Sequence, residues 1–262
     1  MIDTIGIVSD SHCGSRFGLT PPKYWTEKWT TSRDKWLWKC WRTFIRSMPK
    51  LDLLFLNGDL IDGTQHRSEG TGMITTKLSE QVSMAIDCIE PLAAKAKKII
   101  RLEGTGYHES YHGPLKALDI QLGVEKPKDR IDRFVRDIKL DNGAILNIKH
   151  KGEGESTLYR GTSLDRELLW ANLMEVQVGL PAATHLVRSH WHTRAYMESF
   201  HGKSITLCPC WTLQQPYAMH AKYYRWQPSI GGVLMRRDKL SQGGYRVITY
   251  DYPLPKREAE TL

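Results

Sequence analysis

The sequence predicts an α/β fold with mixed β-sheets, and three observations support this prediction. Six short apolar runs recur along the 262 residues, helical patterns lie between several of them, and two hairpin signals join neighbouring runs. A chain of this length can bury a sizeable core as one domain. Because no internal repeat, low-complexity tract or long linker divides it, we expect a single domain over residues 1–262.

Each apolar run has the length of a buried strand. The predicted strands are 5–8, 53–56, 99–102, 144–148, 185–187 and 205–207. Asp141-Asn142-Gly143 is a tight-turn signal that predicts an antiparallel hairpin of residues 134–140 and 144–150. A second hairpin is predicted for residues 232–236 and 245–250. The sheets should therefore contain both parallel and antiparallel pairs.

Three segments have the periodicity of helices with one buried face. The first covers residues 37–48, where Pro49 follows as a stop. The second runs from about residue 75 towards 96, with Pro91 as a kink or break. The third is expected at about 163–178.

The composition favours an anionic partner and a reducing compartment. The formal net charge is +8, and a basic surface concentrates phosphates and polyanions, although a solvated face of Lys and Arg is an equal alternative. The five cysteines are odd in number and scattered, and we interpret the Cys208 and Cys210 pair as buried thiols rather than metal ligands. No leader or membrane-spanning pattern is present, so we expect a cytoplasmic protein without membrane contact.

Aspartates and histidines follow five of the predicted strands and hairpins. They are Asp10 and His12, Asp59, His108, His150, and the pair His190 and His192. Side chains two positions apart on an extended segment point the same way, so each close pair can face one point. Oxygen and imidazole ligands without thiolates suit Mn, Fe, Zn, Co or Ni. A lone histidine is more often a structural residue, but this ordered set predicts a metal site.

Asp59 is the carboxylate best suited to bridge two metals. Two ions roughly 3.5 to 4 Å apart can activate a bridging water to hydroxide and neutralise phosphoryl oxygens during in-line displacement. The pattern therefore indicates hydrolysis of a phosphate ester.

These residues resemble the motifs of the calcineurin-like metallophosphoesterases. The family pattern is DxH, then GDxxD, then GNH followed by an acid, then a lone H, then GHxH. The matching positions are Asp10-Ser11-His12, Gly58-Asp59-Leu60-Ile61-Asp62, His108-Glu109, His150 and His190-Trp191-His192. The resemblance implies a four-layer sandwich of two mixed β-sheets flanked by helices, with a dinuclear site at the sheet edge.

The resemblance also implies a role for each residue. One metal would be held by Asp10, His12, Asp59 and His192, and the other by Asp59, His150 and His190. His108 would stabilise the transition state or protonate the leaving oxygen, so His108 and Asp59 are the expected catalytic residues. The cofactors would be two divalent metal ions, with Mn expected first and Fe, Zn, Co or Ni as alternatives.

The third motif departs from the family pattern, because its Asn is missing from Gly104-Thr105-Gly106-Tyr107-His108. Either Thr105 or Tyr107 can be aligned with that position. We place Thr105 there, and hence among the metal ligands, because a small hydroxyl resembles an amide oxygen better than a phenol does. This choice matches a Gly-Thr-x-x-His version of the motif in phage-type relatives. Ser189, where the last motif has Gly, is a minor departure.

Residues 16–48 form a Trp-rich segment that contains five of the nine tryptophans among Lys and Arg residues. Such a mixture could stack bases, but the segment directly follows the first motif, and we favour core packing and a lid over the site. Arg16, Arg67 and His112 are the expected substrate contacts, with an idle surface position as the alternative for each. The tail from about residue 253 is predicted to be loosely ordered.

The predicted function is that of a metal-dependent phosphoesterase that hydrolyses phosphodiester bonds in nucleotides or nucleic acid by attack of a metal-bridging hydroxide. The positive charge and the aromatic segment favour a nucleic-acid partner over a phosphoprotein. The alternatives are a small-molecule phosphomonoesterase and a non-catalytic metal-binding scaffold of the same fold. The sequence does not indicate an oligomeric state.

Overall fold

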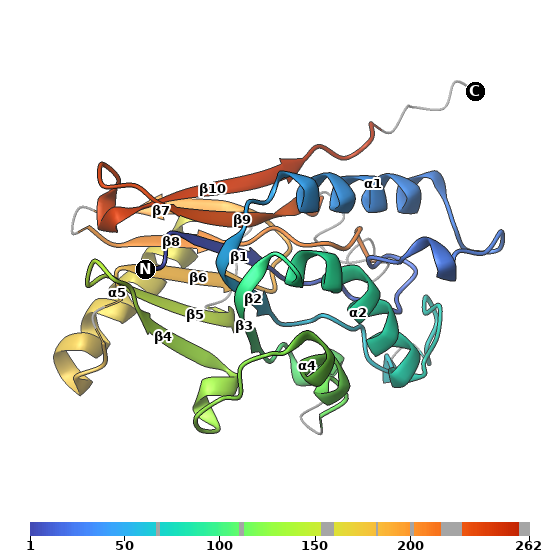
Figure 1. The fold of residues 1–262 in the computed structure, drawn as a ribbon, viewed down its shortest axis with the longest axis horizontal. Coiled ribbons are helices and arrows are strands. Elements are labelled where there is room, and N and C mark those ends of the chain that lie inside the picture. Colours follow the sequence, from blue (N-terminus) through green and yellow to red (C-terminus); the bar gives the residue numbers. More distant parts are fainter. Residues whose placement is uncertain are drawn as a thin grey trace.

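The computed structural model describes residues 1–66, 69–109, 113–152, 160–181, 183–199, 202–215 and 227–256. These residues form two five-stranded sheets that pack face to face, with helices on the outer side of each sheet (Figure 1). The predicted α/β sandwich of two mixed sheets flanked by helices is thereby confirmed.

The first sheet carries the strands that precede the first three motifs. Its order is β10 (Tyr245–Tyr252), β9 (Ile230–Arg237), β1 (Thr4–Val8), β2 (Leu51–Asn57) and β3 (Ala96–Leu102). β1, β2 and β3 are parallel, whereas β9 pairs antiparallel with β1 and with β10. Because parallel strands end at one edge, the motifs after β1, β2 and β3 meet there.

The second sheet carries the strands that precede the last two motifs. Its order is β4 (Val135–Lys139), β5 (Ile145–Lys151), β6 (His185–Ser189), β8 (Ser204–Leu207) and β7 (Ala195–Glu198). β5, β6 and β8 are parallel, and β4 and β7 are antiparallel edge strands. The turn between β4 and β5 contains Gly143 at φ 87°, a conformation that glycine adopts without strain. Both predicted hairpins are confirmed.

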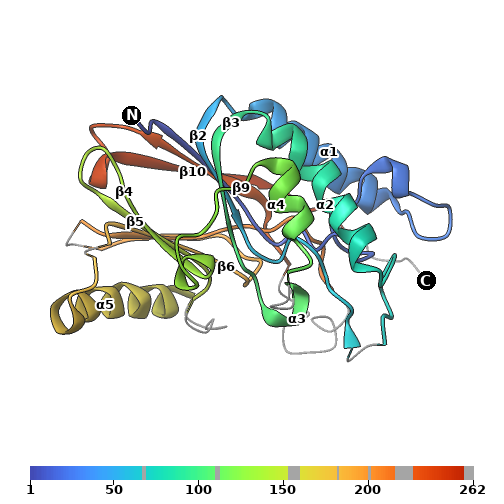
Figure 2. The same ribbon diagram turned by 60° about the horizontal axis from the view of Figure 1, so that its bottom comes forward.

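Helices cover the outer faces of the two sheets (Figure 2). The first sheet is covered by α1 (Ser32–Ser47), α2 (Leu78–Ala93) and α4 (Lys116–Leu122), and the second by α5 (Arg160–Val178). The remaining short elements are α3 (Gly106–Glu109) and three turns of 3₁₀ helix, η1 (Pro22–Tyr24), η3 (Ile131–Arg133) and η4 (Gln242–Gly244). Among the described helices, none is both long and apolar enough to cross a membrane.

Local sequence explains where the two main helices begin and end. Thr31 and Asp34 form a reciprocal capping box that satisfies the first amide groups of α1. Pro91 was expected to kink or break α2, but it lies in the last turn, and the helix continues to Ala93. Proline removes the hydrogen bond from its own position to the carbonyl four residues earlier, and here the helix ends two residues later.

The core lies in three layers that the strand alternation explains. In β2, Leu54 and Leu56 pack against the helices, whereas Leu53 and Phe55 face the second sheet. A third cluster joins Leu168 and its neighbours on α5 to the outer face of the second sheet. Burying one such aliphatic or aromatic side chain contributes about 1.5–3 kcal/mol.

The Trp-rich segment contributes to this core in part. Trp41 is 1% exposed and stacks on Phe44, and both rings contact Trp211. Trp36 and Trp38 are partly buried against the same cluster. At the other end of the chain, Leu254 packs on this core although a loose tail was expected from residue 253, and residues 257–262 lie outside the described part.

Candidate metal centre

The sheet edge where the motifs meet gathers the predicted metal ligands from both sheets. Asp10 follows β1, Asp59 follows β2, and His150 lies on β5. His190 and His192 follow β6. The predicted catalytic residue, His108, is on the single turn α3 after β3.

Five of these residues have a left-handed backbone. They are Asp10 (φ 53°), His12 (φ 43°), Asp59 (φ 51°), His190 (φ 76°) and His192 (φ 55°). In the described part of the chain, only Gln65 and Glu69 are further non-glycine residues with positive φ. Such residues are uncommon and tend to cluster at functional sites, because surrounding contacts must hold them in place. Here the loops hold each other, since the amides of Asp10 and His12 donate to the carbonyls of Gly58 and Asp59, both at 3.0 Å.

Two glycines let these loops approach closely around Asp59. A Cβ atom on Gly58 would lie 2.6 Å from both the Gly104 Cα and the His150 Nδ1. A Cβ atom on Gly104 would lie 2.1 Å from the Asp59 Oδ1. Any side chain at either position would therefore displace a predicted ligand.

The first group of ligands, which we call the Asp10 half-site, contains Asp10, His12 and His192. The Asp10 Oδ1 lies 3.3 Å from the His192 Nε2 and 3.9 Å from the His12 Nε2, and these two nitrogens are 3.2 Å apart. The His12 Nδ1 donates to the Asp62 Oδ1 at 2.8 Å, which turns its Nε2 into the half-site. Asp10 and His12 are buried.

The second group, the Asp59 half-site, contains Asp59, His150 and His190. The Asp59 Oδ2 lies 3.0 Å from the His150 Nε2 and 3.8 Å from the His190 Nδ1. The His150 Nδ1 donates to the carbonyl of Asn57 at 2.6 Å, so its Nε2 faces Asp59. The two half-sites are adjacent, because the His150 Nε2 is also 3.9 Å from the Asp10 Oδ1. Asp10 thus lies near imidazole nitrogens of both half-sites.

These residues fit divalent metal ions. Within each half-site, one ligand atom from each of the three residues lies within 4.8 Å of the others. The Asp10 Oδ1 is buried and has no hydrogen-bond partner, although imidazole nitrogens of three residues surround it. A buried anionic oxygen without a donor is costly, and a cation coordinated by it and by the nearby imidazoles removes that cost. Carboxylate and imidazole ligands suit Mn, Fe, Zn and related ions.

The charges of the metal-free chain differ between the half-sites. Burial opposes ionisation of Asp59, but the positive charge of His150 outweighs it, and the pKa of Asp59 is well below its ordinary value. Burial likewise disfavours the charged form of His150, but Asp59 and Asp10 raise its pKa to about 10. In contrast, burial and the charge of His108 lower the pKa of His12. His150 therefore carries a proton at neutral pH, whereas His12 is neutral.

His108 lies beside the Asp10 half-site and is held through Nδ1. This atom lies 3.0 Å from the carbonyl of Asp62 and 3.3 Å from its carboxylate. The ring packs edge-on against His12 at 4.4 Å between centroids. Burial favours the neutral form of His108, but the hydrogen bond to Asp62 and nearby carboxylates raise its pKa to about 9. His108 is therefore protonated at neutral pH.

Asp62 is the residue whose importance the motif alone did not reveal. It belongs to the second motif, but no role was predicted for it. In the structure its carboxylate contacts both His12 and His108, and the Gln215 amide donates to it at 3.4 Å. Its position three residues after Asp59 was the available signal.

Thr105 contacts Asp59, whereas Tyr107 does not. The Thr105 amide and hydroxyl donate to the Asp59 Oδ1 at 2.7 Å and 3.1 Å. The Tyr107 hydroxyl donates to Gln65 at 2.9 Å, at the surface. The neighbouring Glu109 accepts from the amides of Leu60 and Gly104 and so joins the second and third motif loops. Thr105 is thus in place to orient Asp59.

The other predicted positions have mixed outcomes. Arg16 stacks on Trp29, with its Cζ 3.4 Å from the ring centroid. Arg67 and His112 lie outside the described residues. The Ser189 hydroxyl accepts a hydrogen bond from the Asn57 side chain at 2.7 Å and so joins the two sheets, which a glycine could not do. All five cysteines are buried, as expected, and none of them forms a disulfide.

Comparisons with known proteins give matches among solved structures, whereas no family model and no curated protein matches the chain. A dimetal phosphatase from Danio rerio is 12% identical, with a TM-score of 0.47 over 96% of this chain and 99% of that chain. A metallophosphoesterase from Sphaerobacter thermophilus is 10% identical, with a TM-score of 0.42 over 96% of this chain and 89% of that chain. Vps29 from Entamoeba histolytica, in complex with Zn²⁺, is 14% identical, with a TM-score of 0.45 over 95% of this chain and 98% of that chain.

Metal-dependent phosphoesterases are among the solved structures similar to this chain. At identities of 10% to 14%, this likeness assigns no activity to the chain.

Proposed function

We propose that the chain is a metal-dependent phosphoesterase that hydrolyses phosphodiester bonds. The observation that carries the proposal is the buried Asp10 Oδ1, which has no hydrogen-bond partner and faces three imidazole nitrogens. A buried carboxylate oxygen without a hydrogen-bond donor is costly, and a cation held by Asp10 and these imidazoles would remove that cost.

Asp10, His12 and His192 would hold one divalent ion, and Asp59, His150 and His190 would hold the other. When bound, two such ions supply Lewis acidity and lower the pKa of a coordinated water. Manganese is the first expectation for both half-sites, and zinc and iron suit the same ligands. Thr105 would act by fixing the Asp59 carboxylate through two hydrogen bonds.

His108 would supply the proton for the leaving oxygen. Asp62 holds the Nδ1 of its ring, so the proton available for transfer is the one on Nε2. A pKa of about 9 keeps that proton in place at neutral pH, and positioned acids of this kind accelerate proton transfer to a leaving group. The edge-on contact with His12 keeps the ring beside the Asp10 half-site.

A phosphodiester within a polyanion such as nucleic acid is favoured because of the positive net charge of the chain. The net charge of +8 suits a substrate with anionic groups on both sides of the reacting phosphate. We further propose that the chain acts as a single domain in a reducing compartment, since its five cysteines are buried and free.

The test is Mn-dependent hydrolysis of bis-p-nitrophenyl phosphate and p-nitrophenyl phosphate by the wild type and by Asp59→Asn. Asp165→Asn, on the exposed side of α5, is a matched control for the same chemical change. We expect turnover of the diester that needs added metal, is lost about 10³-fold in Asp59→Asn and is unchanged in the control. Turnover of the monoester alone would favour a phosphomonoesterase. Metal binding without turnover of either ester would favour a non-catalytic scaffold.

A further inference from the structure

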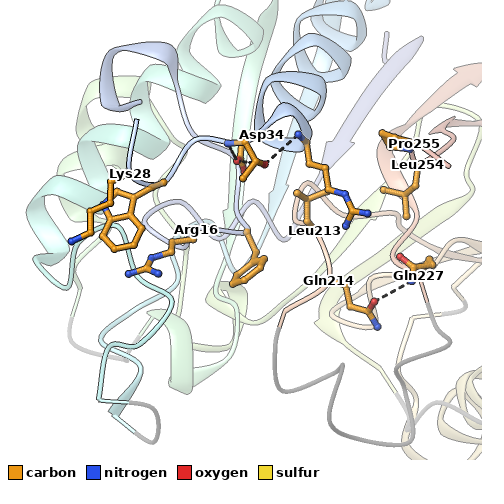
Figure 3. Close-up of a pocket in the computed structure, with 12 residues that line it drawn as sticks. Arg16, Lys28, Asp34, Leu213, Gln214, Gln227, Leu254 and Pro255 are labelled. Carbon is orange, nitrogen blue, oxygen red and sulfur yellow. Dashed lines mark hydrogen bonds between the residues drawn. The ribbon is translucent and has the colours of Figure 1, made fainter. Parts of the chain in front are cut away.

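A cavity of about 970 Å³ is lined in part by Arg16 and Phe17, which follow the first metal motif, and the functions discussed so far make no use of it. Its walls come from the Trp-rich segment, the strip 213–214, Gln227 and the described end of the chain. In Figure 3, Arg16 and Lys28 lie on one side, and Gln214, Gln227, Leu254 and Pro255 lie on the other. None of the proposed metal ligands lines it.

The strip 211–215 connects this cavity to the metal centre. The Trp211 amide donates to the carbonyl of Asp10 at 3.0 Å, and the Leu213 amide donates to the carbonyl of Phe17 at 2.7 Å. The Gln215 side chain then reaches the Asp62 carboxylate. Trp211 and Gln215, which flank the cavity-lining residues 213 and 214 in sequence, thus contact residues of the metal centre, and the strip links the two places.

The cavity is basic. Arg16, Lys28 and Arg33 line it, and in the described part of the chain no carboxylate forms an ion pair with any of them. The one acidic residue of the wall, Asp34, accepts hydrogen bonds from the Thr31 amide and hydroxyl and is occupied by capping α1. Three cations around one concave surface form a site for phosphate groups.

The cavity also has the planar and polar groups that bind a base. The Arg16 Cζ lies 3.4 Å and the Lys28 Nζ 4.4 Å from the centroid of Trp29. The Arg16 Nε donates to the carbonyl of Met73 at 3.3 Å, so the guanidinium plane is held in one orientation. Guanidinium planes and aromatic rings stack on unpaired bases. The amides of Gln214 and Gln227, which are hydrogen-bonded to each other at 3.1 Å, are groups that can bind base edges.

We propose that this cavity binds a nucleotide of single-stranded nucleic acid that flanks the phosphodiester at the metal centre. The proposal rests on the phosphoesterase activity inferred above and names its substrate class. A single strand is required because a base must leave its stack to enter a concave site lined by side chains. Arg16, Lys28 and Arg33 contact phosphates, and the Arg16–Trp29 pair supports the base.

The experiment measures binding of a fluorescent ten-residue oligothymidylate by anisotropy, with EDTA present to prevent cleavage. Three phosphate contacts on a single strand predict a loss of affinity of about 20-fold between 50 and 200 mM salt. The Lys28→Glu/Arg33→Glu double variant should bind at least about tenfold more weakly, with a shallower salt dependence.

The matched control is Lys39→Glu/Arg42→Glu, because these two residues are exposed on α1 outside the cavity wall. It changes the net charge by the same amount and should bind as the wild type does. Trp29→Ala should weaken binding about tenfold, and Trp29→Phe, which keeps a ring under Arg16, should restore most of it. Thermal unfolding of each variant identifies any that fail to fold, and the charge-reversal pair tests the cavity independently of Trp29.

Equal weakening in the two charge-reversal variants would overturn the proposal, as would equal affinity for a duplex of the same length. Hydrolysis of bis-p-nitrophenyl phosphate by the wild type tests the phosphoesterase activity separately from binding in the cavity. Turnover without cavity-dependent binding would refute only the cavity proposal. Cavity-dependent binding without turnover would refute the phosphoesterase activity and leave a single-strand binding site.

Discussion

The Asp10 half-site and the Asp59 half-site use the same residue types, but the metal-free chain satisfies their carboxylates differently. The Asp59 carboxylate is paired with His150 at 3.0 Å and accepts two hydrogen bonds from Thr105. The Asp10 Oδ1, in contrast, has no hydrogen-bond donor. The His150 imidazolium is 3.0 Å from Asp59 and 3.9 Å from Asp10, so it pairs more closely with Asp59, and the Asp10 Oδ1 is left without a hydrogen-bond donor.

This difference predicts the order in which metals bind. An ion in the Asp10 half-site gains ligands without displacing a proton from His12, whose pKa is lowered by burial and by His108. An ion in the Asp59 half-site must first displace the proton of His150. In a dinuclear site of this kind, one half can bind a metal directly, whereas the other binds a metal only when the metal displaces a proton from a ligand.

The largest expected effect is a loss of turnover without any change in metal binding at either half-site. His108→Asn should lower turnover of the dinucleotide dTpdT about 10² to 10⁴-fold, because its leaving oxygen needs a proton. Turnover of bis-p-nitrophenyl phosphate should fall much less, since p-nitrophenolate leaves without one. Metal content should stay at the wild-type value in both half-sites. His66→Asn, at an exposed histidine, serves as the control, and an equal loss with both substrates would contradict the role of His108 as an acid.

The next effect should be confined to the Asp10 half-site. Asp62→Asn weakens the hydrogen bond that orients His12, and changes of this kind typically cost 10- to 100-fold in metal affinity. Titration calorimetry with Mn²⁺ should show weaker binding in the tighter class of sites and no change in the weaker class. Weakening of both classes would mean that the two half-sites do not bind metals independently.

The pH dependence of metal binding should be stronger in the Asp59 half-site than in the Asp10 half-site. Because the pKa of His150 is about 10, one proton leaves when a metal binds at any lower pH. The affinity of this half-site should therefore fall about tenfold when the pH is lowered from 8 to 7, while that of the Asp10 half-site changes less. Calorimetry in two buffers with different ionisation enthalpies measures the proton release for each class. Equal proton release from both classes of metal site would contradict the proposed difference between the two half-sites.

The smallest effect concerns the Thr105 hydroxyl. Thr105→Val removes one hydrogen bond to Asp59 and should weaken metal binding in that half-site about fivefold, equivalent to about 1 kcal/mol. Thr105→Asn should strengthen binding there, because its amide oxygen adds a ligand of the type the metal accepts. Metal titrations of the two variants provide the measurement. Changes of the same sign in both variants would argue against Thr105 as the counterpart of the family's Asn.

Much of this fold could be predicted because buried strands have continuous apolar runs. The missed elements have weaker signals. α4 has seven residues, with Leu118 and Leu122 buried, so its period is too short to detect. β7 is a four-residue edge strand with half of its positions exposed. Both are stabilised by the neighbours they pack on, which a single sequence does not reveal.

The residue types of the candidate site could be predicted from the sequence. The different hydrogen bonding of its two half-sites could not. Motif spacing predicted Asp10 and His150 as metal ligands, and the structure places them close together. That Asp10 would lack a donor while Asp59 was paired depends on how the motif loops meet in space. Arg16 and Trp29 stack across thirteen positions without any periodic pattern, so the sequence could not distinguish a lid from a cavity wall.

The left-handed backbone of five ligands also affects how this protein can change. Each such residue costs roughly 1–2 kcal/mol relative to glycine, and five together approach the total stability of an ordinary domain. Replacing the half-buried His190 or His192 with glycine should remove this backbone cost together with a predicted metal ligand. Selection for thermal stability alone would favour loss of activity at these positions, and a directed-evolution experiment should keep a functional screen in every round.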